Sequence, residues 1–517
     1  MNKLYSSIIT AKTGTQIPVF TSGRTIESRY NPQNDAERLL ATVNSSKSFF
    51  IVFGIGSGIL IKTLLEKNKF CTVLAIENSD DDINFLLQLE YVKEIKNNIR
   101  CTFCTKNQIK EILPLVYVPS FYGDMQIIEQ RAWITEIGND ILQLQQEIQQ
   151  ALSLISADYS VQTHFGKIWQ TNIKNNLQII EKANCERAQS KYKSKSNSEP
   201  DLLNIDTQKT ARIIAAGPSL DNKIELLKKE RKSSYIIATD TAFSTLLKHN
   251  IIPDSVVSID GQHISQTHFI HKTDFTKTLF IFELTANSNA IKHVQNHGGT
   301  IIFCRNEHPL STLAAEYSEK SIIHLFTGSG TVTIAAADFA IKAGFTQIEV
   351  FGADFSYSNG KPYAKGTYLD SIYSKQSSRI QPVEQFYSKL MFRTELQKLT
   401  ETSSTTKILE SYKFSFEEYL KNLNLEFKKE NGIYKIENQN IKQLLELKKT
   451  TVNTKDFYSY IKKNFNDEQK CFYQLNKTEL ALLPAAAFYK RKNFYADNDN
   501  SIFEFLKLAY NSLVGYN

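Results

Sequence analysis

The feature that most constrains the fold is a series of short, continuous apolar runs between about residues 205 and 400. Such runs are uniformly apolar instead of alternating, which is typical of strands buried on both faces of a parallel sheet. Helical segments such as Val332–Ala343 lie between them. We therefore predict a doubly wound, Rossmann-like α/β domain over 205–400. The runs are Arg212–Gly217, Tyr235–Asp240, Ser255–Asp260, Lys277–Leu284, Thr300–Cys304 and Ile348–Asp354.

A second α/β domain, also Rossmann-like, is expected over 1–185. The run Ser48–Gly54 leads into the glycine-rich turn GIGSG, a helical segment and a second strand that ends at Glu77. Dinucleotide and methyl-donor folds place a ribose-binding acid there. A lone glycine turn is more often a tight connection between strand and helix, and we expect that structural role here. The acids 80–82 are expected in a solvated turn.

The remaining segments complete the expected domain organisation. Residues 186–204 are expected to form a linker, because Arg187–Asp201 is rich in Ser, Lys and Asn and buries little apolar surface. From 401 to 517 the spacing of apolar residues predicts a helical C-terminal domain, as in Phe414–Phe427 and Ser501–Leu513.

Composition excludes several classes of function. The net charge is +7 and is spread along the chain without a dense Lys/Arg stripe, so an anionic small molecule or an acidic protein is a better partner than nucleic acid. An apolar run long enough for a membrane span is not found, and the N-terminus does not read as a secretory signal, so we expect a cytoplasmic protein. A lone C-x-x-C pair, Cys101 and Cys104, is expected to remain two thiols, and no metal ligands are assigned.

Polar residues follow three of the expected strands. After the first strand, Gly217 and Pro218 form a turn and Ser219 opens a helix, whose free N–H groups suit a phosphate. The next two strands end in Asp240 and Asp260, and carboxylates accept hydrogen bonds from ribose hydroxyls or base amino groups. Capping of the following helix is the alternative for each residue taken alone. Together they predict a ligand site at this edge of the sheet.

The segment 328–368 adds the groups that carry chemistry. The turn GSGTV, with Gly330 and Thr331, opens a helix of small residues, and Asp354 ends the strand that follows. A polar loop then offers two phenols and two ammonium groups, a suitable set for a departing phosphate. These four residues are Tyr357, Lys361, Tyr363 and Lys365.

Five motifs in this order resemble one known family. The string AAGPSL, ATDTAF, IPDSVVSIDG, GSGTV and GADFSYSNGKPYAKGT resembles the motility accessory factor (Maf) family of flagellin glycosyltransferases, and it is also similar to bacterial sialyltransferases that use CMP-sialic acid. The resemblance covers the central domain most strongly. It implies a glycosyltransferase that moves a nonulosonic acid, of the pseudaminic or legionaminic type, from a CMP-activated donor to Ser or Thr of flagellin, for flagellum assembly and motility.

The resemblance also implies roles for single residues. Nucleotide contacts fall on the turn Gly217, Pro218 and Ser219, on the strand ends Asp240, Asp260 and Asp354, and on Gly330 and Thr331. Tyr363 falls on a tyrosine that steadies the leaving phosphate, Tyr357 supplies a second phenol, and Lys365 a cation. The sialyltransferases use a histidine beyond this loop as general base. No histidine follows His324 here, so the base is unassigned.

Two other functions remain open from the sequence. Archaeal relatives with the same central fold look like pterin pyrophosphokinases, which bind ATP and magnesium. A non-catalytic flagellin-binding chaperone that keeps a nucleotide fold is the second alternative. The sequence leaves the sugar, the acceptor positions, any metal requirement and the oligomeric state undetermined.

Overall fold

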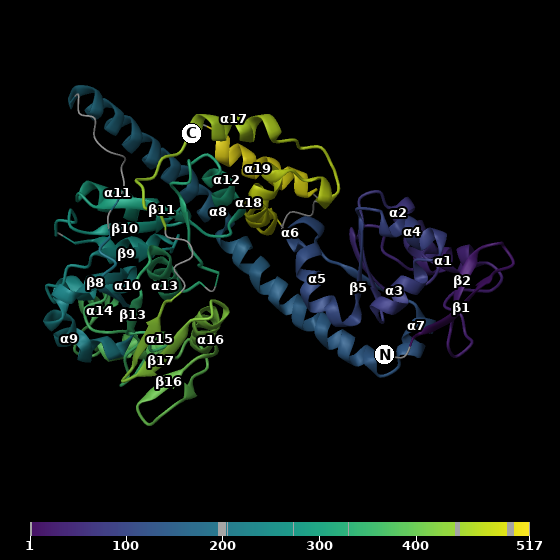
Figure 1. The fold of residues 1–517 in the computed structure, drawn as a ribbon, viewed down its shortest axis with the longest axis horizontal. Coiled ribbons are helices and arrows are strands. Elements are labelled where there is room, and N and C mark those ends of the chain that lie inside the picture. The colour runs from purple at the N-terminus through teal and green to yellow at the C-terminus, as the bar shows by residue number, and fades with distance from the viewer. Residues whose placement is uncertain are drawn as a thin grey trace. The chain divides into compact units, whose positions relative to one another are not determined.

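The computed structural model describes residues 3–194, 203, 205–271, 273–328, 330–439, 445–493 and 501–515. The chain forms two compact units (Figure 1). The terminal unit comprises Met1–Lys167 and Asn464–Asn517, and the central unit comprises Ile168–Lys463. This division differs from the expected boundaries near 185 and 401. The reason is that the C-terminal helices α18 (Lys477–Asn493) and α19 (Ile502–Val514) pack on each other, and α18 also packs on α6 (Pro119–Tyr122).

The terminal unit is built on a four-stranded parallel sheet in the order β5-β4-β3-β6. Its strands are β3 (Phe49–Phe53), β4 (Thr72–Glu77), β5 (Cys101–Thr105) and β6 (Gln126–Glu129). The expected strand, turn, helix and strand are confirmed as β3, α2 (Ile59–Lys67) and β4. A hairpin of β1 (Tyr5–Thr10) and β2 (Gln16–Phe20) precedes them. The other helices are α1 (Pro32–Leu40), α3 (Asp80–Leu86), α4 (Glu90–Lys96), α5 (Ile109–Val116) and α7 (Arg131–Ile137).

The expectation of a solvated turn at 80–82 is wrong in two respects, although Asp80 and Asp81 are exposed: the residues are helical, and the third acid is buried. Ser79 caps helix α3, and Asp80 begins it. Asp82 is only 1% exposed, and it accepts hydrogen bonds from the backbone N–H of Leu4 at 2.8 Å and from the Ser79 hydroxyl at 2.6 Å. The acid is therefore buried because it ties the N-terminal segment to the start of this helix.

The expected linker begins later than predicted. Helix α8 (Asp140–Ser194) continues through the first part of the Ser- and Lys-rich segment. Arg187 helps to hold it, because its guanidinium donates to the carbonyls of Ala183 at 3.3 Å and Thr450 at 3.1 Å. Residues 195–202 and 204 lie outside the described part of the chain.

The central unit has a nine-stranded sheet in the order β12-β11-β10-β9-β8-β7-β13-β18-β17. The seven strands from β12 to β13 are parallel, which confirms the doubly wound α/β prediction. They are β7 (Thr210–Ile214), β8 (Ser234–Thr239), β9 (Ser255–Ser258), β10 (Leu279–Glu283), β11 (Thr300–Arg305), β12 (Ile323–His324) and β13 (Gln347–Phe351). The helices between them include α9 (Ile224–Lys229), α10 (Asp240–Lys248), α11 (Ser288–Asn296), α12 (Pro309–Ala315) and α13 (Val332–Ala343).

The expectation of a helical region from 401 onwards is wrong over part of its length. Helices α16 (Lys407–Asn422), α17 (Thr454–Asn464) and α19 are present, but β17 (Glu426–Glu430) and β18 (Ile433–Glu437) form a hairpin that pairs antiparallel with β13. Its turn is Asn431-Gly432, and both residues have positive φ. This dipeptide is a strong hairpin signal. The hairpin covers an edge of the sheet that would otherwise be open.

A small subdomain connects β13 to α16. It contains β14 (Tyr357–Ser358), α14 (Tyr368–Gln376), α15 (Val383–Met391), β15 (Gln397–Lys398) and β16 (Ser403–Thr405). The short strands form a sheet in the order β14-β16-β15. The subdomain therefore starts directly after Asp354 and returns the chain to α16.

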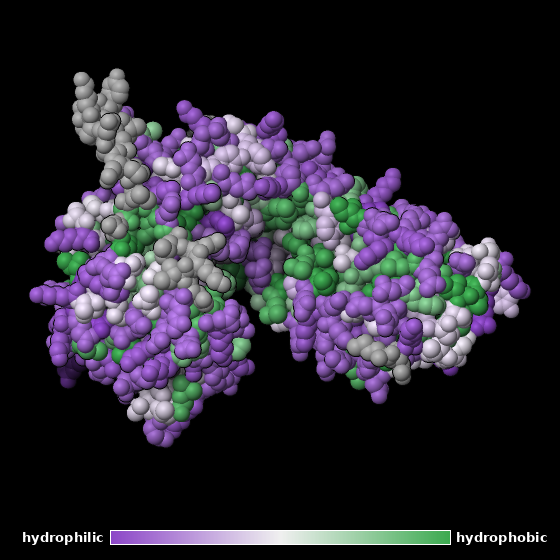
Figure 2. All heavy atoms as spheres, in the orientation of Figure 1, coloured by the Kyte–Doolittle hydropathy of each residue, from purple (hydrophilic) through white to green (hydrophobic). Residues whose placement is uncertain are grey.

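Hydrophilic side chains dominate the face of each unit that Figure 2 shows, with hydrophobic side chains scattered among them. Within the described ranges, none of the helices combines the length and apolar character that a membrane crossing requires.

Candidate functional site

The candidate site lies where the strand order of the central sheet reverses. After β7 the chain adds β8 on one side, and β13 later takes the other side. Both neighbours are parallel to β7. In open α/β sheets ligands bind outside the carboxyl ends of the strands at such a switch point. The loops after β7 and β13 are therefore the first place to look for a ligand.

A pocket of about 270 Å³ opens at this point. Its lining comes from the loops after β7, β8 and β13, from the start of α13 and from α16. Six residues singled out in the sequence line it together: Gly217, Gly330, Thr331, Asp354, Tyr357 and Tyr363. Within the described chain, five others do not belong to its lining: Pro218, Ser219, Asp240, Asp260 and Lys365.

Two glycines allow the loops after β7 and β13 to meet. The N–H of Gly217 donates to the carbonyl of Gly352 at 2.8 Å. A Cβ atom at Gly352 would lie 2.2 Å from the carbonyl oxygen of Ala215, and one at Gly217 would lie 2.4 Å from the Gly352 oxygen. Gly352 also has a φ of +65°. Only glycine fits both positions without moving the backbone.

Asp354 fixes the same turn through its side chain. Its Oδ2 atom accepts a hydrogen bond from the backbone N–H of Ser219 at 2.8 Å. Asp354 therefore ties the loop after β13 to the short helical turn Pro218–Lys223. Its carboxylate also contributes to the pocket wall.

The start of α13 also lines the pocket. Thr331 is the N-cap residue, but its hydroxyl makes no capping hydrogen bond, and it lines the pocket. Gly330 before it has a φ of +71°, and its N–H bonds to the Thr327 carbonyl at 2.9 Å. The first N–H groups of a helix have no partner within the helix and attract anions.

Tyr357 and Tyr363 line the pocket from the subdomain. Although 39% of Tyr363 is exposed, burial of its hydroxyl raises its pKa to about 12, and the neighbouring phenol of Tyr368 adds to this rise. Burial also raises the pKa of Tyr357. Both phenols are therefore protonated at neutral pH and can donate hydrogen bonds to an anion.

Both lysines of this loop, Lys361 and Lys365, contact the carboxylate of Asp221. The Lys361 ammonium is 3.7 Å from a carboxylate oxygen of Asp221, and the backbone N–H of Lys365 donates to the other oxygen at 2.8 Å. The side chain of Lys365 is exposed. The catalytic role expected for Lys365 therefore has no support from the pocket lining and stays a prediction.

Asp240 and Asp260 accept hydrogen bonds from nearby residues. Asp240 is 2% exposed and accepts hydrogen bonds from the N–H of Thr241 at 2.6 Å and the Ser258 hydroxyl at 2.8 Å. Asp260 accepts from the N–H of Gln262 at 2.8 Å, and its burial raises its pKa. These contacts agree with a capping and loop-stabilising role, and direct nucleotide contact by either acid stays a prediction.

The pocket lining also includes residues that were not singled out in the sequence, among them two threonines and two residues of α16. Thr239 and Thr241 lie on either side of Asp240, so the motif ATDTAF contributes its two threonines to the pocket lining. Leu409 and Tyr412 come from α16, one turn apart. No motif connects α16 with the glycine-rich loops, and only the fold brings them together.

The carboxylate of Glu27 fills the glycine-rich turn of the terminal unit. The N–H of Ser57 donates to the Oε1 atom of Glu27 at 2.6 Å, and a Cβ atom at Gly56 would lie 2.4 Å from that oxygen. Glu77 is fully buried and accepts from Trp133 Nε1 at 2.6 Å and from the N–H of Ile55 at 3.1 Å. Glu27 thus occupies an N–H donor that a phosphate would need, and Trp133 and Ile55 occupy the Glu77 oxygens that a ribose would need. The structural role expected for this turn agrees with these contacts.

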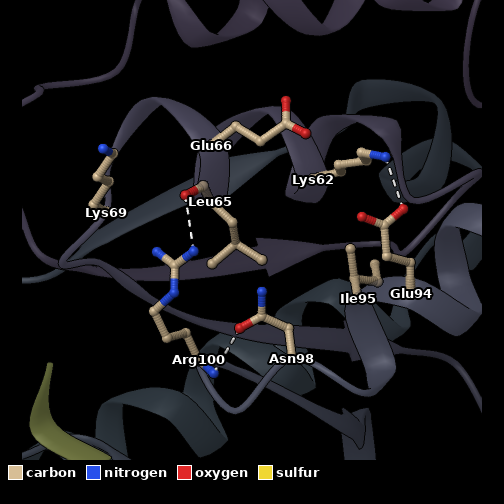
Figure 3. Close-up of a pocket in the computed structure, with 8 residues that line it drawn as sticks. All are labelled: Lys62, Leu65, Glu66, Lys69, Glu94, Ile95, Asn98 and Arg100. Atoms are coloured by element: carbon tan, nitrogen blue, oxygen red, sulfur yellow. Dashed lines mark hydrogen bonds and ion pairs between the residues drawn. The ribbon is translucent and has the colours of Figure 1, made fainter. Parts of the chain in front are cut away.

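A further hollow of about 340 Å³ lies in the terminal unit, between α2, α4 and the start of β5 (Figure 3). The Lys62 ammonium is 2.7 Å from Glu94, and the Arg100 guanidinium donates to the carbonyls of Asn68 and Leu65 at 2.9 and 3.0 Å. Lys62 and Arg100 therefore serve internal contacts, and Glu66 and Glu94 add negative charge to the lining. In the described chain, no cluster of three or more potential ligands is arranged to hold a metal ion.

Comparisons with known proteins agree with this architecture. A family model described as 6-hydroxymethylpterin diphosphokinase MptE-like matches residues 172–360. An uncharacterized protein of Treponema pallidum (strain Nichols) is 40% identical over 141 residues, which are 27% of this chain and 50% of that protein. A second one from the same organism is 34% identical over 155 residues, 30% of this chain and 67% of that protein. The chain thus matches half the length of the first relative and two thirds of the second.

A solved structure extends the likeness to the whole chain. The Maf glycosyltransferase from Magnetospirillum magneticum AMB-1 superposes with a TM-score of 0.51 and 12% identity, covering 99% of this chain and 86% of that one. At this identity the likeness establishes the fold. The chain therefore shares the fold of that Maf glycosyltransferase along its length, and its central part matches the MptE-like family.

Proposed function

We propose that this protein is a glycosyltransferase that moves a nonulosonic acid, such as pseudaminic or legionaminic acid, from a CMP-activated donor to Ser or Thr of flagellin. The observation that carries the proposal is the pocket at the switch point. It combines glycine-lined backbone, a helix N-terminus and the phenols Tyr357 and Tyr363 in one cavity. Most of the residues that line this cavity belong to the motifs that resemble CMP-sialic acid sialyltransferases. The proposal keeps the cytoplasmic location expected from the sequence.

The proposed reaction is a displacement at the anomeric carbon. The bond from that carbon to the phosphate oxygen of CMP breaks, and a bond to the acceptor hydroxyl oxygen forms. The electron pair leaves with CMP, and the hydroxyl proton passes to a base that is not yet assigned. Tyr357 and Tyr363 donate hydrogen bonds to the departing phosphate, whose negative charge grows along the reaction. Donors that are already oriented toward growing charge lower the barrier most.

Calorimetric titration with CMP, and with ATP and GDP as controls, tests the proposal first. Selective binding of CMP is the expected result. Turnover of a CMP-activated nonulosonic acid with purified flagellin then tests the transfer itself. Absence of CMP binding would contradict the proposed donor.

An ATP-dependent pterin pyrophosphokinase is the second candidate, because the match over residues 172–360 is to an MptE-like family. Preference for ATP in the same titration, with pyrophosphoryl transfer to a hydroxymethylpterin, would favour it. Stable binding of flagellin without turnover of any nucleotide would instead favour a chaperone.

A further inference from the structure

The C-terminal hairpin brings a cation to the edge of the pocket. Lys429 lies on β17, and its ammonium nitrogen is 3.4 Å from the carbonyl oxygen of Ala353, toward which it donates. The same nitrogen lies 4.5 Å from the ring centroid of Tyr434 on β18. Ala353 lines the pocket and directly precedes Asp354. The ammonium therefore contacts the turn that carries the pocket carboxylate.

The positive charge of Lys429 matters because the pocket and its proposed ligand are both negatively charged. A donor with a phosphate and a sugar carboxylate brings negative charge into a pocket that already contains Asp354, and like charges in a partly desolvated site repel strongly. Asp354 also has a structural role, because its Oδ2 atom accepts the hydrogen bond of the Ser219 N–H. A cation beside the turn offsets this repulsion.

We propose that Lys429 is a positioning residue that holds the Gly352–Asp354 turn and neutralises its carboxylate, so that an anionic nucleotide can bind next to Asp354. The inference rests on the proposed function, since it takes the pocket to be the anion site. It assigns a role to the hairpin, in which the sequence showed no chemical motif.

The electrostatics of Lys429 agree with this assignment. Burial of the ammonium between the turn and Tyr434 lowers its pKa, and the negative charge of Asp354 acts in the opposite direction and raises it. Lys413 lowers the pKa as well, while Glu417 raises it. Asp354 is therefore one of three charged side chains whose fields act on Lys429, beside its contact with the Ala353 carbonyl.

Affinities of the full-length protein for CMP and for uncharged cytidine test the inference. Lys429→Met is expected to weaken CMP binding about tenfold, as loss of one charge-assisted interaction does, and to change cytidine binding by less than about threefold. Lys429→Arg is expected to restore CMP binding. Lys428→Met is the matched control, because Lys428 lies next to Lys429 but pairs with Glu430 at 2.9 Å. An equal loss for both ligands, or no loss, would overturn the inference.

A measurement without nucleotide separates this inference from the proposed function. Asp354→Asn removes the negative charge, so the pKa of the Lys429 ammonium, followed by NMR of its side chain, is expected to fall below its wild-type value. An unchanged Lys429 pKa would overturn the coupling even if CMP binds. A lowered pKa in a protein that does not bind CMP would keep the coupling and contradict the proposed donor.

Discussion

Asp354 shows how one side chain can serve both the fold and the site. The sequence placed it at a strand end and assigned it to the nucleotide, and it does lie in the pocket wall. One of its oxygens, however, holds the N–H of Ser219. Such a division of tasks cannot be derived from a motif, because it depends on where a loop 135 residues earlier in the chain lies.

The role of Tyr363 gives the first prediction at this scale. Tyr363→Phe removes a donor from the pocket but keeps the ring, so folding should be unchanged and kcat should fall about 100-fold, as for loss of one oriented donor. Single-turnover rates with a CMP-activated donor measure the effect. Tyr373→Phe is the control, because Tyr373 stacks on Phe386 and is not part of the described pocket lining. Equal rates for the two variants would exclude the phosphate-binding role of Tyr363.

A second residue-scale prediction concerns glycine. Gly352→Ala should lower the free energy of unfolding by about 3 kcal/mol or more, because the new methyl group meets the Ala215 carbonyl at 2.2 Å and the backbone has a positive φ. Gly360 has a similar φ of +69° but nothing within 4 Å of its Cβ position, so Gly360→Ala should cost only about 1 kcal/mol. Thermal unfolding of both variants distinguishes close approach from backbone strain.

At the scale of elements, uniform apolar runs were enough to predict the parallel strands, because burial on both faces leaves a simple pattern. The hairpin β17–β18 was missed, because its Lys- and Glu-rich strands cover a sheet edge and read as a helical region. Asn431-Gly432 was the available signal. Tyr412 could not be predicted as part of the site, since α16 reaches the pocket only through the fold.

The terminal unit should show a characteristic dependence on pH. Burial raises the pKa values of Glu27 and Glu77 to about 7, and one oxygen of Glu27 is buried without a hydrogen-bond partner. The folded unit therefore holds more protons than the unfolded chain between the ordinary value near 4.5 and about 7. Its free energy of unfolding should fall as pH rises through this window, by up to about 3 kcal/mol for each carboxyl.

Urea unfolding of the wild type and of Glu27→Gln from pH 5 to 8 tests this dependence. Gln keeps an acceptor for the Ser57 N–H but does not titrate. The free energy of unfolding of the variant should therefore change with pH about half as steeply as that of the wild type. A wild-type stability that rises over the same range would contradict the buried, protonated state of Glu27.

At the scale of the whole molecule, the terminal unit is assembled from both ends of the chain. Phe121 packs on Phe472 and Phe503, with ring centroids 5.3 and 6.0 Å apart. Truncation after Lys463 should therefore expose this aromatic cluster and make the terminal unit sensitive to proteolysis, while the central unit stays resistant. Limited proteolysis with mass spectrometry checks this. Equal resistance of both units in the truncated chain would contradict it.

The same discontinuity sets an order of events during biosynthesis. The ribosome releases the complete central unit before it has made the last helices of the terminal unit. The segment Met1–Lys167 must then wait, with part of its apolar surface uncovered, until the segment Asn464–Asn517 has been made. A stop codon that removed the segment Asn464–Asn517 would therefore harm the folding of a segment made much earlier, and not only that of its neighbours in the sequence.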